Sequence, residues 1–138
     1  MRLLLDEDYK ILDEAGLIYE EDFKNRFLII KNFPLCSDLY VYNDEPIEEV
    51  EVLVVIPSNY NTSGINMFWT HPELKRADGI GIPAAQVFGG QFSKNFDNKE
   101  FCRWSRHWPD GSWGSKVDNV QKILDRLEWA LRNPNTNR

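Results

Sequence analysis

The run from residue 49 to residue 56, Glu-Val-Glu-Val-Leu-Val-Val-Ile, restricts the possible folds of this chain more than any other stretch. It is rich in β-branched residues, and after Glu51 it is continuously apolar. Such residues favour an extended strand, and an unbroken apolar run is typical of a strand that is covered on both faces. We therefore expect a central strand here, with a sheet built around it.

Three shorter strand patterns surround this run, at residues 26 to 33, 38 to 42 and 66 to 70. Prolines and turn-forming residues mark their ends. Because the connections between them are short, neighbouring strands are expected to pair as hairpins, which makes the sheet antiparallel. The sequence therefore predicts an antiparallel four-stranded meander.

Helical spacing of apolar residues marks one segment on each side of these strands. Residues 6 to 15 begin with three acids, which suit the positive end of a helix. Residues 117 to 132 show the clearer pattern, with Ser115 as a candidate N-cap and an apolar stripe formed by Val120, Ile123, Leu124, Leu127 and Leu131. Asp118 and Asn119 are also expected to cap this helix rather than to take part in chemistry. Both helices must cover one face of the sheet, so we expect a single α+β two-layer domain over residues 1–134 and a frayed tail at 135–138.

The net charge of −6 is unevenly spread along the chain. Residues 1–60 hold 14 acids and 5 bases, whereas residues 61–138 hold 8 acids and 11 bases. An acidic half argues against nucleic acid as a partner, because phosphates need a basic face. It suits docking to a basic protein surface, for which Asp6, Asp8 and Asp13 are candidates. The alternative interpretation is that these acidic residues form a solvated surface that binds no partner.

Several classes of protein are excluded by what the sequence lacks. No run approaches the ~18 apolar residues of a membrane span, and the first residues lack the pattern of a signal peptide, so we expect neither feature. Two cysteines form no disulfide framework, so we expect reduced thiols in a cytoplasmic protein. Neither a metal-ligand spacing of Cys and His nor a nucleotide-binding glycine motif is present, so we expect no metal and no cofactor.

Side chains that could take part in a reaction are concentrated in residues 101 to 108, Phe-Cys-Arg-Trp-Ser-Arg-His-Trp. One interpretation is an amphipathic strand with Trp inward and Arg outward. The other is a reactive site whose nucleophile is shielded by aromatic side chains. Residues 73 to 100, which precede it, carry four glycines and no periodicity, and we expect an irregular functional excursion without a helix longer than about three turns.

The order of these fragments resembles the ubiquitin-conjugating-enzyme fold, and more closely its prokaryotic family E. The resemblance covers about a hundred residues and rests on Gly16-Leu17, Phe33-Pro34-Leu35, Val54-Val55-Ile56-Pro57 with Tyr60, Asn66-Met67-Phe68, Leu74 to Gly79, Arg103 to His107, Trp113-Gly114 and Val117-Asp118-Asn119. The chain departs from the family pattern at Asn61, where a proline is usual. His71-Pro72-Glu73 starts like the His-Pro-Asn motif of eukaryotic enzymes but lacks its Asn, so we interpret His71 as structural.

The resemblance implies transfer of a ubiquitin-like modifier. An activating enzyme, a ThiF-like adenylyltransferase, would adenylate the C-terminal Gly of the modifier. This chain would then accept the acyl group as an ester and pass it to a target protein. The resemblance also implies a bacterial setting, often antiphage defence. The alternatives are a catalytically inactive scaffold of the same fold that binds the activating enzyme or the modifier, and an unrelated module that binds a small ligand or sugar in a Trp-lined groove.

Two residues are candidates for the nucleophile. Cys102 would form a thioester, and thiols ionise more easily than hydroxyls. Ser105 would form an oxyester, and it precedes Trp113 by the eight residues that separate nucleophile and Trp in eukaryotic conjugating enzymes. In an extended chain His107 shares a face with Ser105 and is the candidate base. Arg103 and Arg106 are candidates for stabilising the oxyanion, with surface solubilisation as the alternative.

Overall fold

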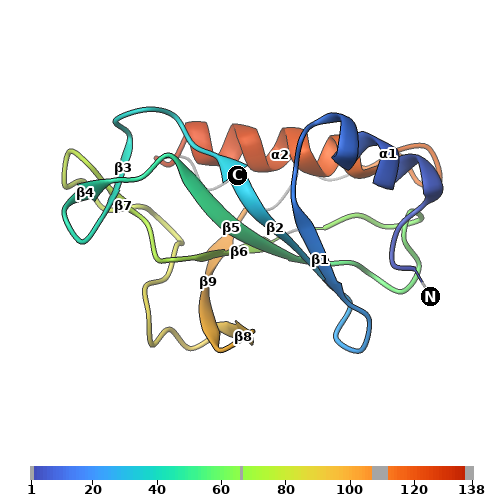
Figure 1. Ribbon diagram of the computed structural model, residues 1–138, viewed down its shortest axis with the longest axis horizontal. Helices are drawn as coiled ribbons and strands as arrows, with labels where there is room; N and C mark the ends of the chain where they lie inside the picture. The colour runs from blue at the N-terminus through green and yellow to red at the C-terminus, as the bar shows by residue number, and fades with distance from the viewer. Residues whose placement is uncertain (1, 66, 107–111, 136–138) are drawn as a thin grey trace.

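A computed structural model of the chain describes residues 2–65, 67–106 and 112–135. A mixed α+β architecture is formed, with an antiparallel sheet between an N-terminal and a C-terminal helix in chain order (Figure 1). The elements are α1 (Asp6–Glu14), β1 (Tyr19–Asp22), β2 (Phe27–Pro34), β3 (Tyr40–Tyr42), β4 (Glu45–Pro46), β5 (Glu49–Val55), β6 (Met67–His71), β7 (Lys75–Arg76), β8 (Lys94–Phe96), β9 (Lys99–Ser105) and α2 (Val120–Arg132).

The main sheet has six strands in the order β1-β2-β5-β6-β9-β8, so the expected four-stranded meander is wrong in strand number. The predicted central strand is confirmed, because β5 pairs with β2 on one edge and with β6 on the other. The predicted strand at residues 38 to 42 does not join this sheet. It is β3, which forms a separate three-stranded sheet with β4 and β7.

Local turn chemistry explains why β3 leaves the main sheet. Asn43 and Asp44 both have positive φ, and they form a two-residue loop between the paired residues Tyr42 and Glu45. Two successive residues of positive φ make the tight hairpin turn whose twist matches that of its strands. The segment after β2 therefore folds back on itself, and β2 pairs directly with β5.

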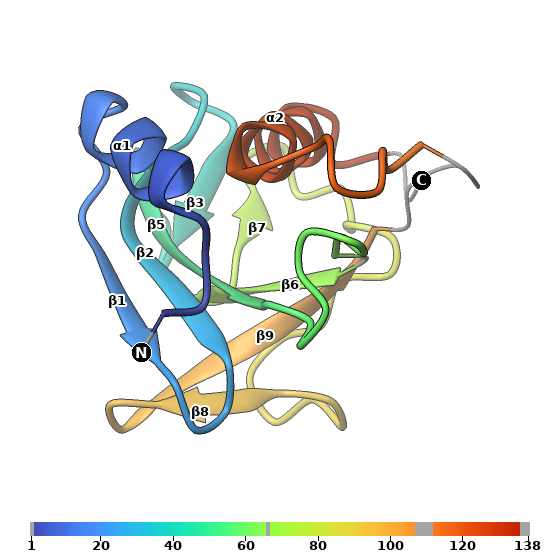
Figure 2. The same ribbon diagram turned by 90° about the vertical axis from the view of Figure 1, so that its right-hand side faces the viewer.

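A second hairpin of the same kind adds the last two strands. Asp97 and Asn98 have positive φ and separate Phe96 from its partner Lys99. The hairpin of β8 and β9 curls below the sheet on the side away from the helices (Figure 2). Residues 73 to 100, all of them described, contain no helix, as expected, although they include β7, β8 and the first two residues of β9.

The two faces of the main sheet are covered differently. On one face, side chains such as Leu28 and Val54 form the larger core with the apolar stripe of α2. Burial of each such side chain stabilises the folded state by about 1.5–3 kcal/mol relative to leaving it in water. Among the described residues, the other face carries none from the two helices, and we call it the open face for that reason. There the β8–β9 hairpin helps to cover a smaller cluster formed by Phe27, Ile29, Leu53, Trp69 and Phe101. None of the described helices has the length and apolar character needed to cross a membrane.

Asp8 joins the two helices. Its Oδ1 accepts a hydrogen bond of 2.9 Å from the backbone N–H of Val120, the first residue of α2, and its Oδ2 accepts one of 2.9 Å from Leu5. The side chain is fully buried. Asp8 is therefore not a docking charge, and that part of the expectation is wrong; Asp6 and Asp13 are exposed on α1.

Helix α2 begins later than expected. Its N-cap is Asn119, whose side-chain oxygen accepts a hydrogen bond of 2.9 Å from the backbone N–H of Gln121. The expectation that Asn119 caps this helix is therefore confirmed. The other candidate, Ser115, lies in a turn, where the backbone N–H groups of Val117 and Asp118 bond to the carbonyl of Gly114. The apolar stripe is buried as expected.

We expect Asn119→Ala to lower the free energy of unfolding by about 1 kcal/mol, because the amide of Gln121 loses its acceptor. Urea denaturation of the purified chain measures this change. Ser115→Ala is the matched control and should leave the urea midpoint unchanged, because Ser115 is exposed and does not cap the helix. Equal effects of the two substitutions would contradict this assignment of the cap.

Candidate functional site

Strand β9 carries most of the predicted site residues, and its register places them on two faces. Ser105 pairs with Met67, and Arg103 pairs with Trp69. Because side chains alternate along a strand, Ser105 and Arg103 share the open face with Phe101, while Cys102 and Trp104 lie on the face toward α2. The two candidate nucleophiles are therefore separated by the sheet.

Cys102 lies inside the protein, with 0% of its surface exposed. Burial, with the negative charges of Glu100 and Glu73 as lesser causes, raises the pKa of its thiol to about 12. Since the thiolate is the reactive form of cysteine, almost no reactive Cys102 is present near neutral pH. Both its position and its pKa are those of a structural cysteine.

Ser105 is the last residue of β9 and is half-buried. Its backbone N–H donates a hydrogen bond of 2.9 Å to the carbonyl of Ala84, in the excursion. Its own carbonyl accepts one of 2.9 Å from Nη1 of Arg106. The N–H of Gln86 also bonds to the carbonyl of Arg103, so residues 84 to 86 lie along the end of β9 and fix the position of Ser105.

The two candidate arginines have different environments. The guanidinium of Arg103 lies 4.0 Å from the ring centroid of Phe92, which is exposed on the same side as Ser105. Arg106 is only 1% exposed, stacks on Trp104 at 4.8 Å, and donates from Nη2 to the carbonyl of Pro134 at 3.5 Å. Burial lowers the pKa of Arg106 from its ordinary value. Arg106 therefore ties the end of β9 to the segment after α2, and Arg103 is the arginine on the face of Ser105.

His107, the candidate base, lies outside the described residues, as does Trp108. The other histidine, His71, has its Nδ1 2.9 Å from the carbonyl of Glu100, and its ring lies 5.6 Å from that of Phe101. These contacts agree with the structural role expected for His71. Glu73, at the position of the missing Asn, accepts a hydrogen bond of 2.7 Å from the N–H of Phe88.

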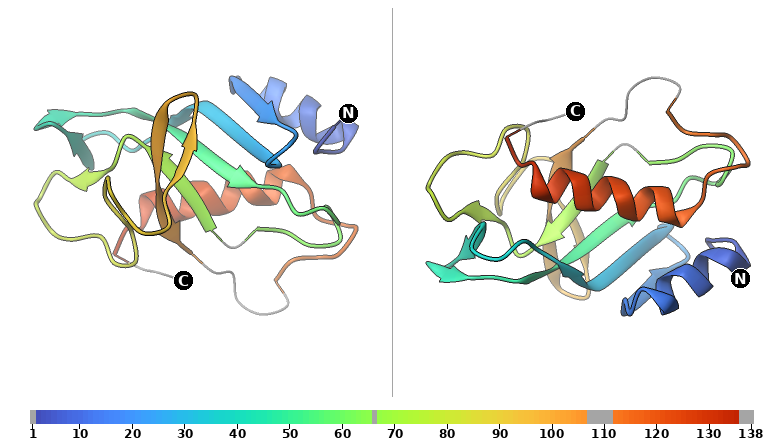
Figure 3. Two further views of the ribbon diagram at one scale, coloured as in Figure 1. Left: turned by 90° about the horizontal axis from the view of Figure 1, so that it is seen from below. Right: turned by 90° about the horizontal axis from the view of Figure 1, so that it is seen from above.

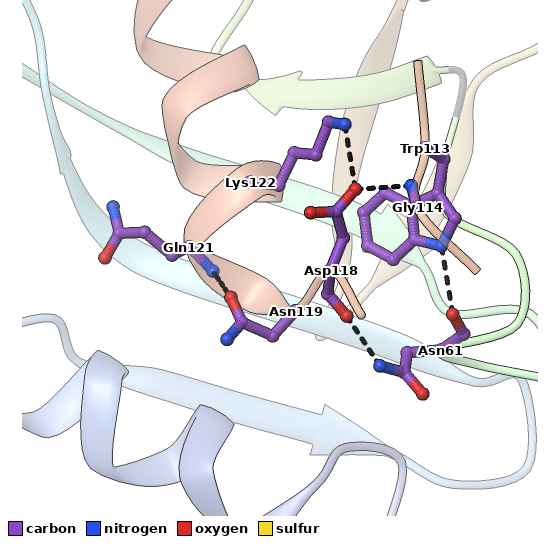
Figure 4. A network of polar contacts seen from close by, with 7 residues as sticks. All are labelled: Asn61, Trp113, Gly114, Asp118, Asn119, Gln121 and Lys122. Carbon is purple, nitrogen blue, oxygen red and sulfur yellow. Dashed lines mark hydrogen bonds and ion pairs between the residues drawn. The ribbon is translucent and has the colours of Figure 1, made fainter. Parts of the chain in front are cut away.

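A polar network that sequence reasoning missed holds the loop before α2 (Figure 4). The carbonyl of Asn61 accepts a hydrogen bond of 3.0 Å from Nε1 of Trp113, and the Asn61 side chain donates one of 2.6 Å to the carbonyl of Asp118. Oδ2 of Asp118 accepts from Lys122 at 2.8 Å and from the N–H of Gly114 at 2.5 Å. The hydrogen bond from Lys122 and, to a smaller extent, the bond from Gly114 hold the pKa of Asp118 below its ordinary value. The signal in the sequence was Asn61 itself, where the family usually has proline.

The described residues contain no group of three or more His, Cys, Asp and Glu side chains able to hold a metal ion.

The two cysteines should differ in their reactivity toward an alkylating reagent. We expect iodoacetamide at pH 8 to modify Cys36, which is partly exposed, and to leave Cys102 unmodified until the protein is unfolded. Peptide mass spectrometry of native and urea-treated samples measures both sites. Rapid native labelling of Cys102 would show that the thiol is accessible and would remove the main argument against it as nucleophile.

The chain matches a protein-family model, while no curated protein and no solved structure matches it. The match, to the family described as prokaryotic E2 family E, extends over residues 4–134 and includes every described element and the whole candidate site. E2 proteins are the ubiquitin-conjugating class, so the family implies in general an activating enzyme and a modifier as partners. The chain belongs to prokaryotic E2 family E.

Proposed function

We propose that this chain is an acyltransferase of the ubiquitin-conjugating type that carries a ubiquitin-like modifier as an oxyester on Ser105. The observation that carries the proposal is the alternation along β9. It leaves Ser105 on the open face at the end of the strand, whereas Cys102 is buried on the opposite face with a raised pKa. The partial exposure of Ser105 and the full burial of Cys102 favour Ser105 as the residue that receives an acyl group from another protein.

The reaction takes place in two steps. Oγ of Ser105 attacks the carbonyl carbon of the modifier's C-terminal Gly, the bond to the activating enzyme's leaving group breaks with its electron pair, and the hydroxyl proton passes to a base. An amine or hydroxyl of the target protein then attacks the ester, and Oγ leaves and regains a proton. A serine hydroxyl needs a positioned base. His107 is proposed for that role from the sequence alone, because it follows Ser105 by two residues and would share its face if the chain stayed extended.

Arg103 is proposed to stabilise the oxyanion in both steps. It is the arginine on the face of Ser105, and its guanidinium is held over Phe92. A cation fixed in place before the reaction stabilises developing negative charge more effectively than one that must reorganise. Arg106 is assigned a positioning role, because its guanidinium is buried and bonds to backbone carbonyls.

The test is the formation of a covalent adduct. The purified chain is incubated with its activating enzyme, the modifier and ATP, and intact-mass spectrometry measures the product. We expect a mass increase equal to the modifier minus one water, only when ATP is present. If the activating enzyme becomes charged and no adduct with the chain forms, the catalytically inactive scaffold replaces the enzyme as the better account.

A further inference from the structure

A groove lies between the end of α1, the end of β2 and one side of α2. It encloses about 250 Å³, and its walls are mainly apolar, formed by Leu17, Phe33, Pro34, Leu35, Leu124 and Leu131. The right-hand view in Figure 3 shows α2 lying along β2 with α1 beside its first turns. We call this hollow the helix-side groove.

The rim of the helix-side groove is acidic. Asp125 and Glu128 line it from α2. The cation among the lining residues, Arg132, is 3.1 Å from Glu128, but both side chains are more than half exposed. Such an exposed pair is weak, so Glu128 can exchange Arg132 for a cation of a partner. Next to Pro34 and Leu35, a neighbouring hollow is lined by Glu48 and Glu49, both exposed. An apolar floor inside an acidic rim is complementary to an aliphatic segment that carries lysine or arginine.

The groove and Ser105 lie on different sides of the main sheet. The walls of the groove belong to the helix side, where Phe33 and Leu124 are part of the larger core. Ser105 lies on the open face beside Met67. A protein bound in the groove therefore leaves Ser105 uncovered. This arrangement suits the protein that delivers the acyl group, since the modifier's C-terminus must occupy the face of Ser105.

We infer that the helix-side groove docks a basic, aliphatic segment of the activating enzyme. The choice of partner rests on the proposed function, whereas the chemistry of the segment rests on the apolar lining and the acidic rim. Lysine or arginine side chains of the segment pair with Asp125 and Glu128, and its aliphatic side chains fill the floor between Leu35 and Leu124.

Cys36 lines the groove and provides a direct test. A bulky thiol reagent, N-phenylmaleimide, should modify Cys36 selectively, because Cys102 is fully buried. We expect the modified chain to bind immobilised activating enzyme at least tenfold more weakly. The Cys36→Ser chain treated with the same reagent is the control and should keep its affinity.

Charge reversal tests the rim. Asp125→Lys with Glu128→Lys should weaken binding at least tenfold, and the difference from the native chain should shrink as salt increases. Glu7→Lys with Glu45→Lys is the control, because it makes the same change in net charge at exposed positions outside the groove. Circular dichroism checks that both variants are folded.

Binding is measured in the Ser105→Ala background, so that no acyl transfer is needed. Loss of binding in the groove variants alone supports the inference even if the nucleophile proves to be another residue. Unchanged binding after both the maleimide and the charge reversal overturns it. Weaker binding of the free modifier instead, or a change in self-association, assigns the groove to the modifier or to a second copy and also overturns the inference.

Discussion

Ser105→Ala should abolish the covalent adduct with the modifier, whereas Cys102→Ala should leave it intact. Strand alternation places the side chain of Ser105 on the open face, and its backbone N–H and carbonyl bond to Ala84 and Arg106. These backbone bonds remain in the Ser105→Ala chain, so we expect the strand to keep its place when the nucleophile is removed. Cys102→Ala removes a buried thiol and should cost stability rather than transfer. Intact-mass spectrometry and thermal unfolding together measure the two effects.

The type of bond between the chain and the modifier provides a control for the identity of the nucleophile. An oxyester resists thiol reductants and is cleaved by hydroxide, whereas a thioester is cleaved by both. The adduct of the native chain should therefore survive dithiothreitol, and the adduct of a Ser105→Cys chain should not. His107→Ala should slow formation of the oxyester by ~10²–10⁴, the usual cost of losing a positioned base. A native adduct that dithiothreitol releases and that Ser105→Ala retains would assign the reaction to a thiol.

Asp8→Ala should lower the free energy of unfolding by about 3 kcal/mol. The substitution removes two hydrogen bonds to a charged acceptor and leaves the N–H groups of Val120 and Leu5 without their partner. The first of these groups begins α2, so the substitution also loosens the contact between the helices. Urea denaturation measures the effect. Asp8→Asn, which keeps an acceptor oxygen, should cost less than Asp8→Ala.

Asp6→Ala and Asp13→Ala are the matched controls, because both side chains are exposed on the same helix. Each should change the free energy of unfolding by at most about 0.5 kcal/mol. If the three substitutions have similar effects, Asp8 does not carry the contact between α1 and α2. This comparison also decides which charges of α1 can be reversed in a docking experiment without damage to the fold.

The parts of the fold that depend on strong local patterns could be predicted from the sequence. Residues 49 to 56 and 117 to 132 carry long apolar patterns, and both formed the expected element. The strand β1 was missed because its sequence, Tyr-Glu-Glu-Asp, has the polar character of an edge strand. A strand at residues 101 to 108 was one of the two interpretations, and β9 confirms it for residues 101 to 105. Its hairpin with β8 was missed, because Asp97-Asn98 was not recognised as a two-residue turn.

The candidate site was predictable only in part, because burial depends on tertiary structure. Strand alternation separates Ser105 from Cys102, but the pattern alone does not say which face α2 covers. No pattern in the sequence indicated that Arg106 is buried, since arginine is almost never fully buried. The role of Asp8 was also hidden, because an acid in the first turn of a helix usually remains in solvent.

The spacing of three residues between Cys102 and Ser105 has an evolutionary consequence. An odd spacing along a strand places two side chains on opposite faces, so no rotation about side-chain bonds can exchange them. A lineage that changed from hydroxyl to thiol chemistry would need a substitution at position 105, or a one-residue insertion that turns every side chain of β9 over and exposes Trp104. The first route leaves the core unchanged and the second destroys it. Among relatives with this strand, variation between Ser and Cys should therefore occur at position 105 and not at position 102.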